Sequence, residues 1–267
     1  MEVNQIIGYI LAVFVGITLG LIGSGGSILS VPILVYVLGI EPILATAYSL
    51  FIVGTTAFVG GFQKAKQKLV DFKKVVLFGI PTLTAVFITR KLIVPAIPET
   101  VFSSNDFVFH KSMLIMVVFA LVMIIASLRM IKPIKTEIST DDKPLNYFKI
   151  VLNGLFIGLV AGFVGAGGGF LIIPALLFLA KTPMKIAVGT SLFIVATQSL
   201  VGFVGDIRPD QVIDWKTLLL FTSCSVIGIF IGNILSKKIS GDKLKTGFGW
   251  MVLLMGIYII TKELFLK

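Results

Sequence analysis

The stretch "GLIGSGGSILSVPIL", from Gly20 to Leu34, places a cluster of glycines and serines inside an apolar run that extends over residues 5–38. Each glycine in a helix interior costs about 1 kcal/mol relative to alanine. Several glycines in succession therefore predict that the helix is interrupted here. A segment that only crosses a membrane has no need of such a break, so the stretch predicts a broken helix with a further role.

The composition predicts a membrane protein. Of the 267 residues, 57% are hydrophobic and only 13% are charged, whereas a soluble domain carries about 25% charged residues. Several charge-free runs reach about 18 residues, the length that a membrane helix needs. The net charge of +10 comes from lysines and arginines between these runs, which is typical of cytoplasmic loops. We therefore expect a multi-pass protein of the cell inner (cytoplasmic) membrane, with no nucleic-acid partner.

The chain contains an internal repeat. Residues Gly16–Gly60 align with Gly158–Gly202 without a gap, and the pentapeptide "SLFIV" occurs at both Ser49–Val53 and Ser191–Val195. Chance apolar similarity does not align glycines, a proline and an identical pentapeptide in one register. The sequence predicts a first transmembrane repeat (1–131), a polar linker (132–147) and a second repeat (148–267). Apolar segments are expected at 5–38, 43–62, 73–89, 112–131, 148–180, 185–205, 216–236 and 246–262.

The fold class expected is an all-α polytopic membrane protein with two tandem homologous repeats, each containing a glycine-broken helix. If each broken segment crosses the membrane once, the repeats have four transmembrane segments each and are parallel. If each crosses twice, the repeats have five segments each and are inverted. Inversion brings more of the lysines and arginines to one side, but both arrangements, with eight or ten segments in total, stay open because transporters use both.

The paired breaks are candidate substrate sites. Pro32 and Pro174 follow the glycines and fit the first turn of a restarting helix, which Ser27 and Ser30 could cap. The N-terminus of such a half-helix attracts anions. Close helix packing is the alternative explanation for glycine; it suits the four-residue spacings at 16/20, 158/162 and 228/232 but not consecutive glycines. The candidate substrate-binding residues in the breaks are Gly23, Ser24, Gly25, Gly26, Ser27, Gly165, Gly167, Gly168 and Gly169.

Polar, uncharged residues on the following helix form a second candidate group. Ser49 and Thr56 in the first repeat correspond to Ser191 and Gln198 in the second, and Thr190 precedes Ser191. The members of each pair lie seven residues apart and so share roughly one helical face. Hydroxyl and amide groups on that face could bind an oxyanion. Hydrogen bonding between helices is the alternative role of such residues.

Charged residues are absent from the interiors of the expected apolar segments. Carboxylates inside a membrane usually mark proton and cation paths, so a site of backbone dipoles and hydroxyls suits an anion better. The lone His110 has no second histidine or cysteine ligand beside it. We therefore expect no metal, no cofactor, no catalytic residue and no enzymatic activity.

The two breaks, each followed by a helix that begins with small and hydroxyl residues ("ATAYSLF", "AVGTSLF"), resemble the sulfite exporter TauE/SafE family of bacterial permeases. The resemblance extends from about residue 8 to 262. It implies movement of small sulfur-containing or organic anions, such as sulfite or sulfonates, across the cytoplasmic membrane.

The function expected is therefore a membrane transporter, in the export direction, for a small anionic substrate. An inside-negative potential drives one negative charge outward by about 2.3 kcal/mol per 100 mV. An anion channel, or a structural or sensory membrane protein without transport, is the alternative. The partners expected are this anion and the lipid bilayer. The sequence leaves open a coupling ion (H+ or Na+) and a homo-oligomer.

Overall fold

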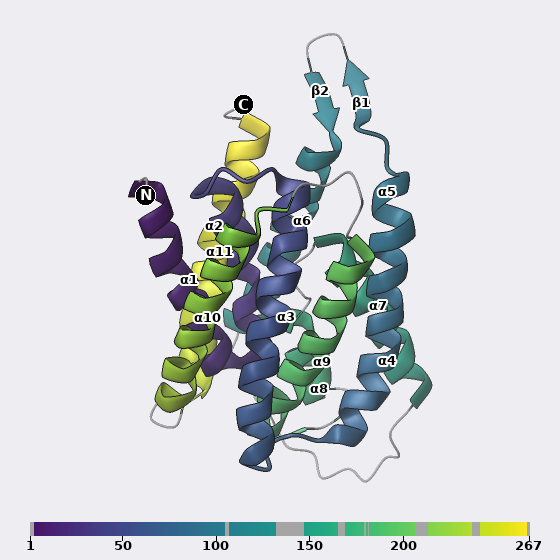
Figure 1. The fold of residues 1–267 in the computed structure, drawn as a ribbon. Helices are drawn as coiled ribbons and strands as arrows, with labels where there is room; N and C mark the ends of the chain where they lie inside the picture. Colours follow the sequence, from purple (N-terminus) through teal and green to yellow (C-terminus); the bar gives the residue numbers. More distant parts are fainter. Residues whose placement is uncertain are drawn as a thin grey trace.

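The fold is a bundle of long helices (Figure 1). The computed structural model describes residues 3–104, 107–131, 147–164, 169–178, 180, 182–206, 213–236 and 241–265. In chain order the elements are α1 (Val3–Ile22), η1 (Gly23–Leu29), α2 (Ser30–Tyr36), α3 (Pro42–Lys66), α4 (Phe72–Ile88), η2 (Thr89–Ile93), α5 (Val94–Ala96), β1 (Thr100–Ser104), β2 (Phe107–His110), α6 (Lys111–Ile131), α7 (Tyr147–Val164), α8 (Gly169–Phe178), α9 (Met184–Asp206), α10 (Trp215–Leu235) and α11 (Gly241–Phe265).

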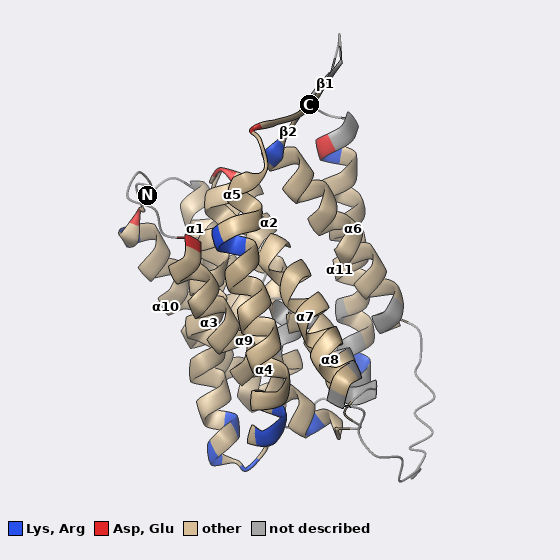
Figure 2. Cartoon of the chain, turned by 90° about the vertical axis from the view of Figure 1, so that its right-hand side faces the viewer, with Lys and Arg blue, Asp and Glu red and all other residues tan. Residues whose placement is uncertain are grey.

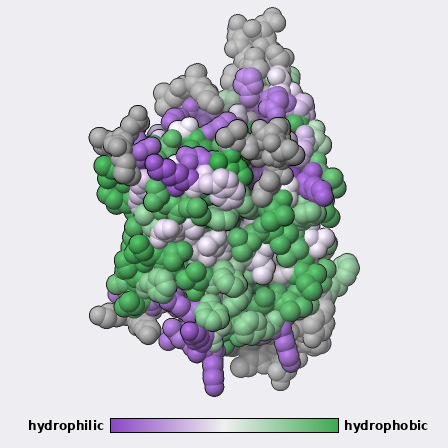
Figure 3. Space-filling view, in the orientation of Figure 1, coloured by the Kyte–Doolittle hydropathy of each residue, from purple (hydrophilic) through white to green (hydrophobic). Residues whose placement is uncertain are grey.

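Six helical stretches among the described residues are long and apolar enough to cross a membrane. Figure 3 shows an apolar band around the middle of the bundle, with polar residues above and below it. Large hydrophobic side chains such as Ile10, Ile80 and Phe156 are more than half exposed, as expected for residues that face lipid. The six stretches are Asn4–Ile22, Pro42–Lys66, Phe72–Ala96, Lys111–Leu128, Met184–Asp206 and Trp215–Leu235, and two shorter apolar helices lie at Ser27–Tyr36 and Ile150–Val164.

A short antiparallel hairpin departs from the all-α expectation. The sequence predicts a polar loop over 98–111, whereas β1 and β2 pair there, with Thr100 opposite His110 and Ser104 opposite Phe107. The hairpin projects beyond the helical bundle, at the end where α1 begins and α11 ends (Figure 1). It therefore lies outside the apolar band, where irregular backbone can bond to water.

Two similar stretches, "DFK" at 71–73 and "DWK" at 214–216, stand at the beginning of α4 and α10. The carboxylate of Asp71 accepts the Lys74 N–H (3.2 Å), and that of Asp214 accepts the N–H groups of Lys216 (3.1 Å) and Thr217 (3.2 Å). Each aspartate thus satisfies donors at the first turn of α4 or α10. Hydrogen bonds from Thr217 hold the pKa of the Asp214 carboxyl below its usual range.

Glycines with four-residue spacing bring helix backbones into close contact, as the packing interpretation predicts. Gly16 and Gly20 on α1 lie against Ser225 and Ile229 of α10, while Gly228 and Gly232 of α10 lie against the α1 backbone. Gly158 and Gly162 on α7 lie in the same way against Thr82 of α4 and Thr89 of η2. In both pairs the contacts advance in the same chain direction, so α1 runs parallel to α10 and α7 runs parallel to α4.

Replacing Gly228 by alanine should destabilise the bundle by about 1–3 kcal/mol. The new Cβ would overlap the carbonyl oxygen of Val13, and a backbone atom cannot move aside without shifting α1. Thermal unfolding of the protein in lipid nanodiscs measures the loss. Gly247→Ala is the control, because no atom lies within 4 Å of a Cβ there; equal stability of the two variants would contradict the close packing of α1 and α10.

The first glycine cluster reverses the chain. Gly23 has a φ of +73°, a left-handed conformation that suits glycine, and the chain then returns through η1 and α2. The side chain of Leu38 lies against Gly8, so the returning segment reaches the level at which α1 begins. The segment 5–38 is therefore two antiparallel helical pieces.

Three local expectations need correction. The break is not unwound, because Gly23–Leu29 forms a 3-10 helix with tighter backbone bonding. The serine caps are wrong: the N-cap position of α2 is Leu29, with no side-chain bond, and the Ser30 hydroxyl donates to the Ser27 carbonyl instead (2.8 Å). Pro32 does lie in the first turn of α2, whereas Pro174 lies in the middle of α8, which begins earlier, at Gly169.

Candidate functional site

The first break lies against the second half of the chain. The 3-10 helix η1 packs against α8 and α9 of the second half. A Cβ on Gly23 would lie 3.0 Å from the Val188 carbonyl and 3.1 Å from the Ser191 hydroxyl, so only a residue without a side chain fits. The structure therefore brings together Gly23 and Ser191, two predicted site residues from different halves of the chain.

Buried hydroxyl groups occur on η1, α2, α3 and α9. Ser30 and Ser49 are fully buried, and their hydroxyl oxygens lie 2.5 Å apart across the contact between α2 and α3. The Ser191 hydroxyl donates to the Val188 carbonyl within α9 (2.9 Å). Ser27, at the centre of η1, is also fully buried. These groups are neutral and can each both donate and accept hydrogen bonds.

The helices α3 and α9 cross each other, and both contact η1. Gly54 on α3 lies against Leu200 of α9, and Gly60 lies against Ile229 and Leu192, so the two helices run in opposite directions. Thr56 and Gln198 lie on the crossing segments and are fully buried. Within the described part of the chain the Thr56 hydroxyl has no hydrogen-bond partner. The same holds for Ser199, which was not predicted as a site residue although it directly follows Gln198.

The remaining predicted break residues are only partly described. Ser24, Gly25 and Gly26 lie in η1, and Gly169 is the first residue of α8. Gly165, Gly167 and Gly168 lie outside the described residues. Their assignment to the site stays a prediction.

Thr190 contributes a contact between the halves. Its hydroxyl accepts the Asp71 N–H (3.0 Å), and the Tyr48 hydroxyl accepts the Asp214 N–H in the same manner (2.5 Å). Tyr48 and Thr190 are aligned positions of the two repeats. Asp71 and Asp214 are also aligned, with a shift of one residue. A hydroxyl that accepts one bond can still donate another, so the role of Thr190 in binding substrate stays a prediction.

The expectation that buried charge is absent is wrong. Arg90 lies in η2, within the candidate span Phe72–Ala96, and is 1% exposed. Its Nη1 donates to the carboxylate of Asp206 (3.2 Å) and to the Thr46 hydroxyl (2.9 Å). Asp206 is 4% exposed and is the last residue of α9 rather than a loop residue. Both charges lie one residue beyond the expected apolar segments 73–89 and 185–205, which is why the sequence analysis missed them.

A second polar cluster lies at the opposite end of α3. The Lys64 ammonium donates to the Ser236 hydroxyl (3.1 Å), and the side-chain amide of Asn233 donates to Gln63. Lys64 is 6% exposed. Figure 2 shows that basic residues gather at this end of the bundle, where α3 is connected to α4. Buried polar clusters thus flank the neutral centre on both sides.

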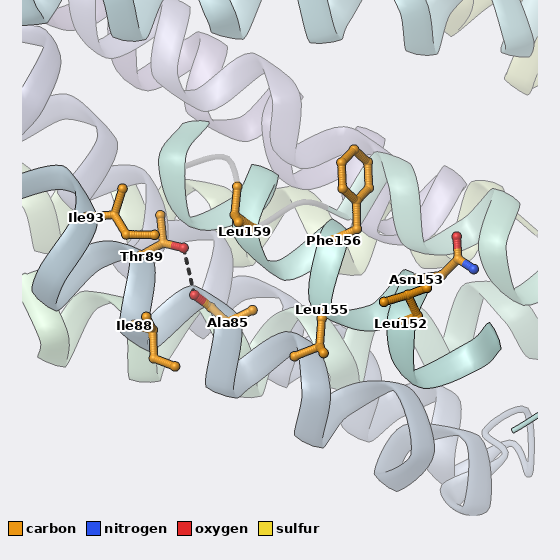
Figure 4. Close-up of a pocket in the computed structure, with 9 residues that line it drawn as sticks. All are labelled: Ala85, Ile88, Thr89, Ile93, Leu152, Asn153, Leu155, Phe156 and Leu159. Carbon is orange, nitrogen blue, oxygen red and sulfur yellow. Dashed lines mark hydrogen bonds between the residues drawn. The ribbon is translucent and has the colours of Figure 1, made fainter. Parts of the chain in front are cut away.

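A surface groove between α4 and α7 has a different character (Figure 4). The only threonine among its lining residues, Thr89, donates its hydroxyl to the Ala85 carbonyl of its own helix (2.7 Å). Its apolar side chains, such as Leu152 and Phe156, are more than half exposed, so the groove faces lipid and offers no charge to an anion. It is lined by Ala85, Ile88, Thr89, Ile93, Leu152, Asn153, Leu155, Phe156 and Leu159.

Metal ligands do not gather in the part of the chain that the structure describes: no group of three or more His, Cys, Asp or Glu side chains occurs there. The arrangement instead offers neutral hydrogen-bonding groups between buried cations, with Lys64 toward one end and Arg90 and Lys111 toward the other. Such a centre can hold a small anion through hydrogen bonds and helix dipoles.

A multi-pass helical protein with a broken helix packed among helices that carry buried polar side chains has the architecture of a membrane transporter. The family model "Sulfite exporter TauE/SafE" matches residues 9–259, and the chain belongs to this family. It is therefore a multi-pass membrane transporter of a family of transporters, not of enzymes.

Curated relatives agree with this assignment. A "Probable membrane transporter protein" of Xylella fastidiosa is 29% identical over 93% of this chain and 92% of its own length. "Probable membrane transporter protein YunE" of Bacillus subtilis is 26% identical over 96% of this chain and 97% of its own length. A probable membrane transporter protein of Methanocaldococcus jannaschii is 26% identical over 94% of both chains. No solved structure matches the fold.

Proposed function

We propose that the protein exports small sulfur-containing or organic anions, such as sulfite or sulfonates, and binds them between its two breaks. The observation that carries this proposal is the contact of η1 with α8 and α9 in the interior of a bundle in which the hydroxyls of Ser49, Thr56 and Ser191 are buried. In lipid, an unpartnered hydroxyl and interrupted backbone are tolerated only where protein or a watery cavity satisfies them. A small oxyanion at this centre would satisfy both.

The helix contacts support two inverted repeats. In the proposed alignment α1 corresponds to α7, α3 to α9, α4 to α10 and α6 to α11. The packing of α1 along α10 then corresponds to the packing of α7 along α4, while α3 with α9 and α6 with α11 are pairs of equivalent helices. The hydrogen bond between Asp71 and Thr190 likewise corresponds to the hydrogen bond between Asp214 and Tyr48 when each residue is replaced by its equivalent in the other repeat.

The charge distribution supports an orientation in a cell inner membrane. Lysines cluster in the connection of α3 to α4, at the lower end in Figure 2. The positive-inside rule places this end in the cytoplasm. An anion that leaves the cell would then pass from the Lys64 end, through the centre, to the Arg90 end. The membrane potential favours this direction.

Flux through purified protein in liposomes tests the proposal. Vesicles loaded with sulfite or methanesulfonate should release them in a protein-dependent and saturable way, and faster when the potential drives negative charge outward. Vesicles loaded with choline provide the control for leakage. Conductance that does not saturate would show that the protein is an anion channel and not a transporter. The absence of flux for every anion would overturn both hypotheses.

A further inference from the structure

The buried guanidinium of Arg90 has one side occupied and one side open. Thr46 and Asp206 both bond to Nη1, whereas Nε and Nη2 have no hydrogen-bond partner among the residues that the structure describes. Nε–H and one Nη2–H point in the same direction from the planar group, so they form one edge with two parallel donors. That edge is the one with which arginine binds two oxygens of a carboxylate, sulfonate or phosphate at once.

Leaving these donors unsatisfied is costly. A buried donor without a partner costs about 1–3 kcal/mol, and more when the group is charged, and Arg90 is 1% exposed. A carboxylate can bond to two guanidinium nitrogens at once. The Asp206 carboxylate bonds to Nη1 and to neither of the other two nitrogens of Arg90. The arrangement fixes the direction of the guanidinium and keeps its second edge for another partner.

The backbone around Arg90 is also irregular. Residues Thr89–Ile93 form a π-helix, a wide turn within an otherwise α-helical span. Such turns occur frequently at functional sites, because they cost hydrogen-bond geometry and are kept where a side chain needs to be placed. Here the turn carries Arg90 toward the start of α3 and the end of α9.

We propose that the open edge of Arg90 is a second binding station for the oxyanion, at the end of the bundle opposite the basic connection between α3 and α4. This station rests on the proposed function, since it extends the path from the central site. Thr46, which bonds to Arg90, and Lys64 lie on α3, on either side of Thr56 and roughly 15 Å and 12 Å from it at 1.5 Å per residue. An anion therefore meets a cation, a neutral centre and a second cation in turn.

Asp206 gives the station a weak affinity that suits release. Its carboxylate neutralises the guanidinium and repels an incoming anion, while the fork geometry still selects a group with two oxygens in one plane. A station without the carboxylate would hold the anion more tightly and slow its departure. The expected ligands are sulfonates, sulfite and carboxylates rather than chloride, which has a single atom to offer.

Arginine side-chain NMR tests the station directly. The chain has three arginines, Arg90, Arg129 and Arg208, so protein labelled with 15N-arginine in nanodiscs gives few Nε–H signals, and Arg90→Lys assigns the one of interest. Addition of methanesulfonate should shift the Arg90 signal in a saturable way. Dimethyl sulfone, of similar shape but without charge, should leave it in place. An Arg90 signal that stays unchanged at methanesulfonate concentrations that saturate flux would overturn the station.

Flux variants separate this proposal from the proposed function. Arg90→Gln combined with Asp206→Asn removes both charges and leaves no unpaired ion, and it should raise the half-saturating methanesulfonate concentration at least about tenfold. Lys91→Gln, an exposed neighbour with the same loss of charge, is the control and should behave as the unmodified protein. Unchanged half-saturation in the double variant, with flux intact, would reject the station but leave the transporter. If the unmodified protein transports no anion, the proposed transport function is wrong. A saturable NMR shift of Arg90 would still identify the anion site in that case.

Discussion

Asp206→Ala should lower the free energy of unfolding by about 3–5 kcal/mol, the range measured when one partner of a buried ion pair is removed. The Arg90 guanidinium would then stay in the bundle interior with only the Thr46 hydroxyl on Nη1. Both side chains are at most 4% exposed, so the guanidinium would lose its neutralising partner in the bundle interior. The loss should appear as a lower unfolding temperature of the protein in nanodiscs.

Two further variants define the cause. Glu99→Ala removes the acid of another ion pair, Lys111–Glu99 (3.7 Å), whose glutamate is 81% exposed. An exposed pair contributes about 1 kcal/mol or less, so this variant should unfold close to the unmodified protein. Adding Arg90→Gln to Asp206→Ala should recover part of the lost stability, since no buried charge remains. A double variant less stable than Asp206→Ala alone would show that the charge is not what destabilises the bundle.

The sequence predicts the parts of this molecule that depend on local backbone chemistry. Clustered glycines cannot continue a helix with low energy, so the interruption at Gly23 follows from the residues themselves, whereas the reversal of the chain there is one of the two arrangements that the sequence leaves open. The spacing of Gly228 and Gly232 likewise indicates a close helix contact without reference to the partner. The family also follows from the sequence, because its motifs are these same glycines.

The contacts between the halves are beyond such an analysis. Arg90 and Asp206 are 116 positions apart and each follows an apolar run, so the sequence treats them as residues of separate loops. Burial of each depends on the other, because neither charge is stable alone in the interior. Hydrogen-bond partners such as Asp71 and Thr190 depend in the same way on how the helices pack. Pairing of distant residues is a property of the assembled bundle.

Thr56→Val should lower anion flux at least about tenfold, equivalent to about 1.4 kcal/mol, while leaving the stability of the protein unchanged or raised. The two effects have opposite signs for a physical reason. The Thr56 hydroxyl is fully buried and has no hydrogen-bond partner, so its desolvation is a cost that valine, of nearly the same shape, removes. A hydroxyl that only supported the fold would lose a bond on replacement and would destabilise the bundle.

Thr222→Val is the matched control for this prediction. Thr222 is also buried in a membrane-spanning helix, but its hydroxyl donates to the Leu218 carbonyl of the same helix (2.7 Å). Its replacement should leave flux within about twofold, because the hydroxyl is already satisfied by a carbonyl of its own helix. Flux in liposomes and unfolding in nanodiscs are both measured on each variant. If Thr56→Val keeps full flux, the hydroxyl does not bind the anion, and the centre of the site must be sought at the breaks alone; if it loses stability and flux together, its role is structural.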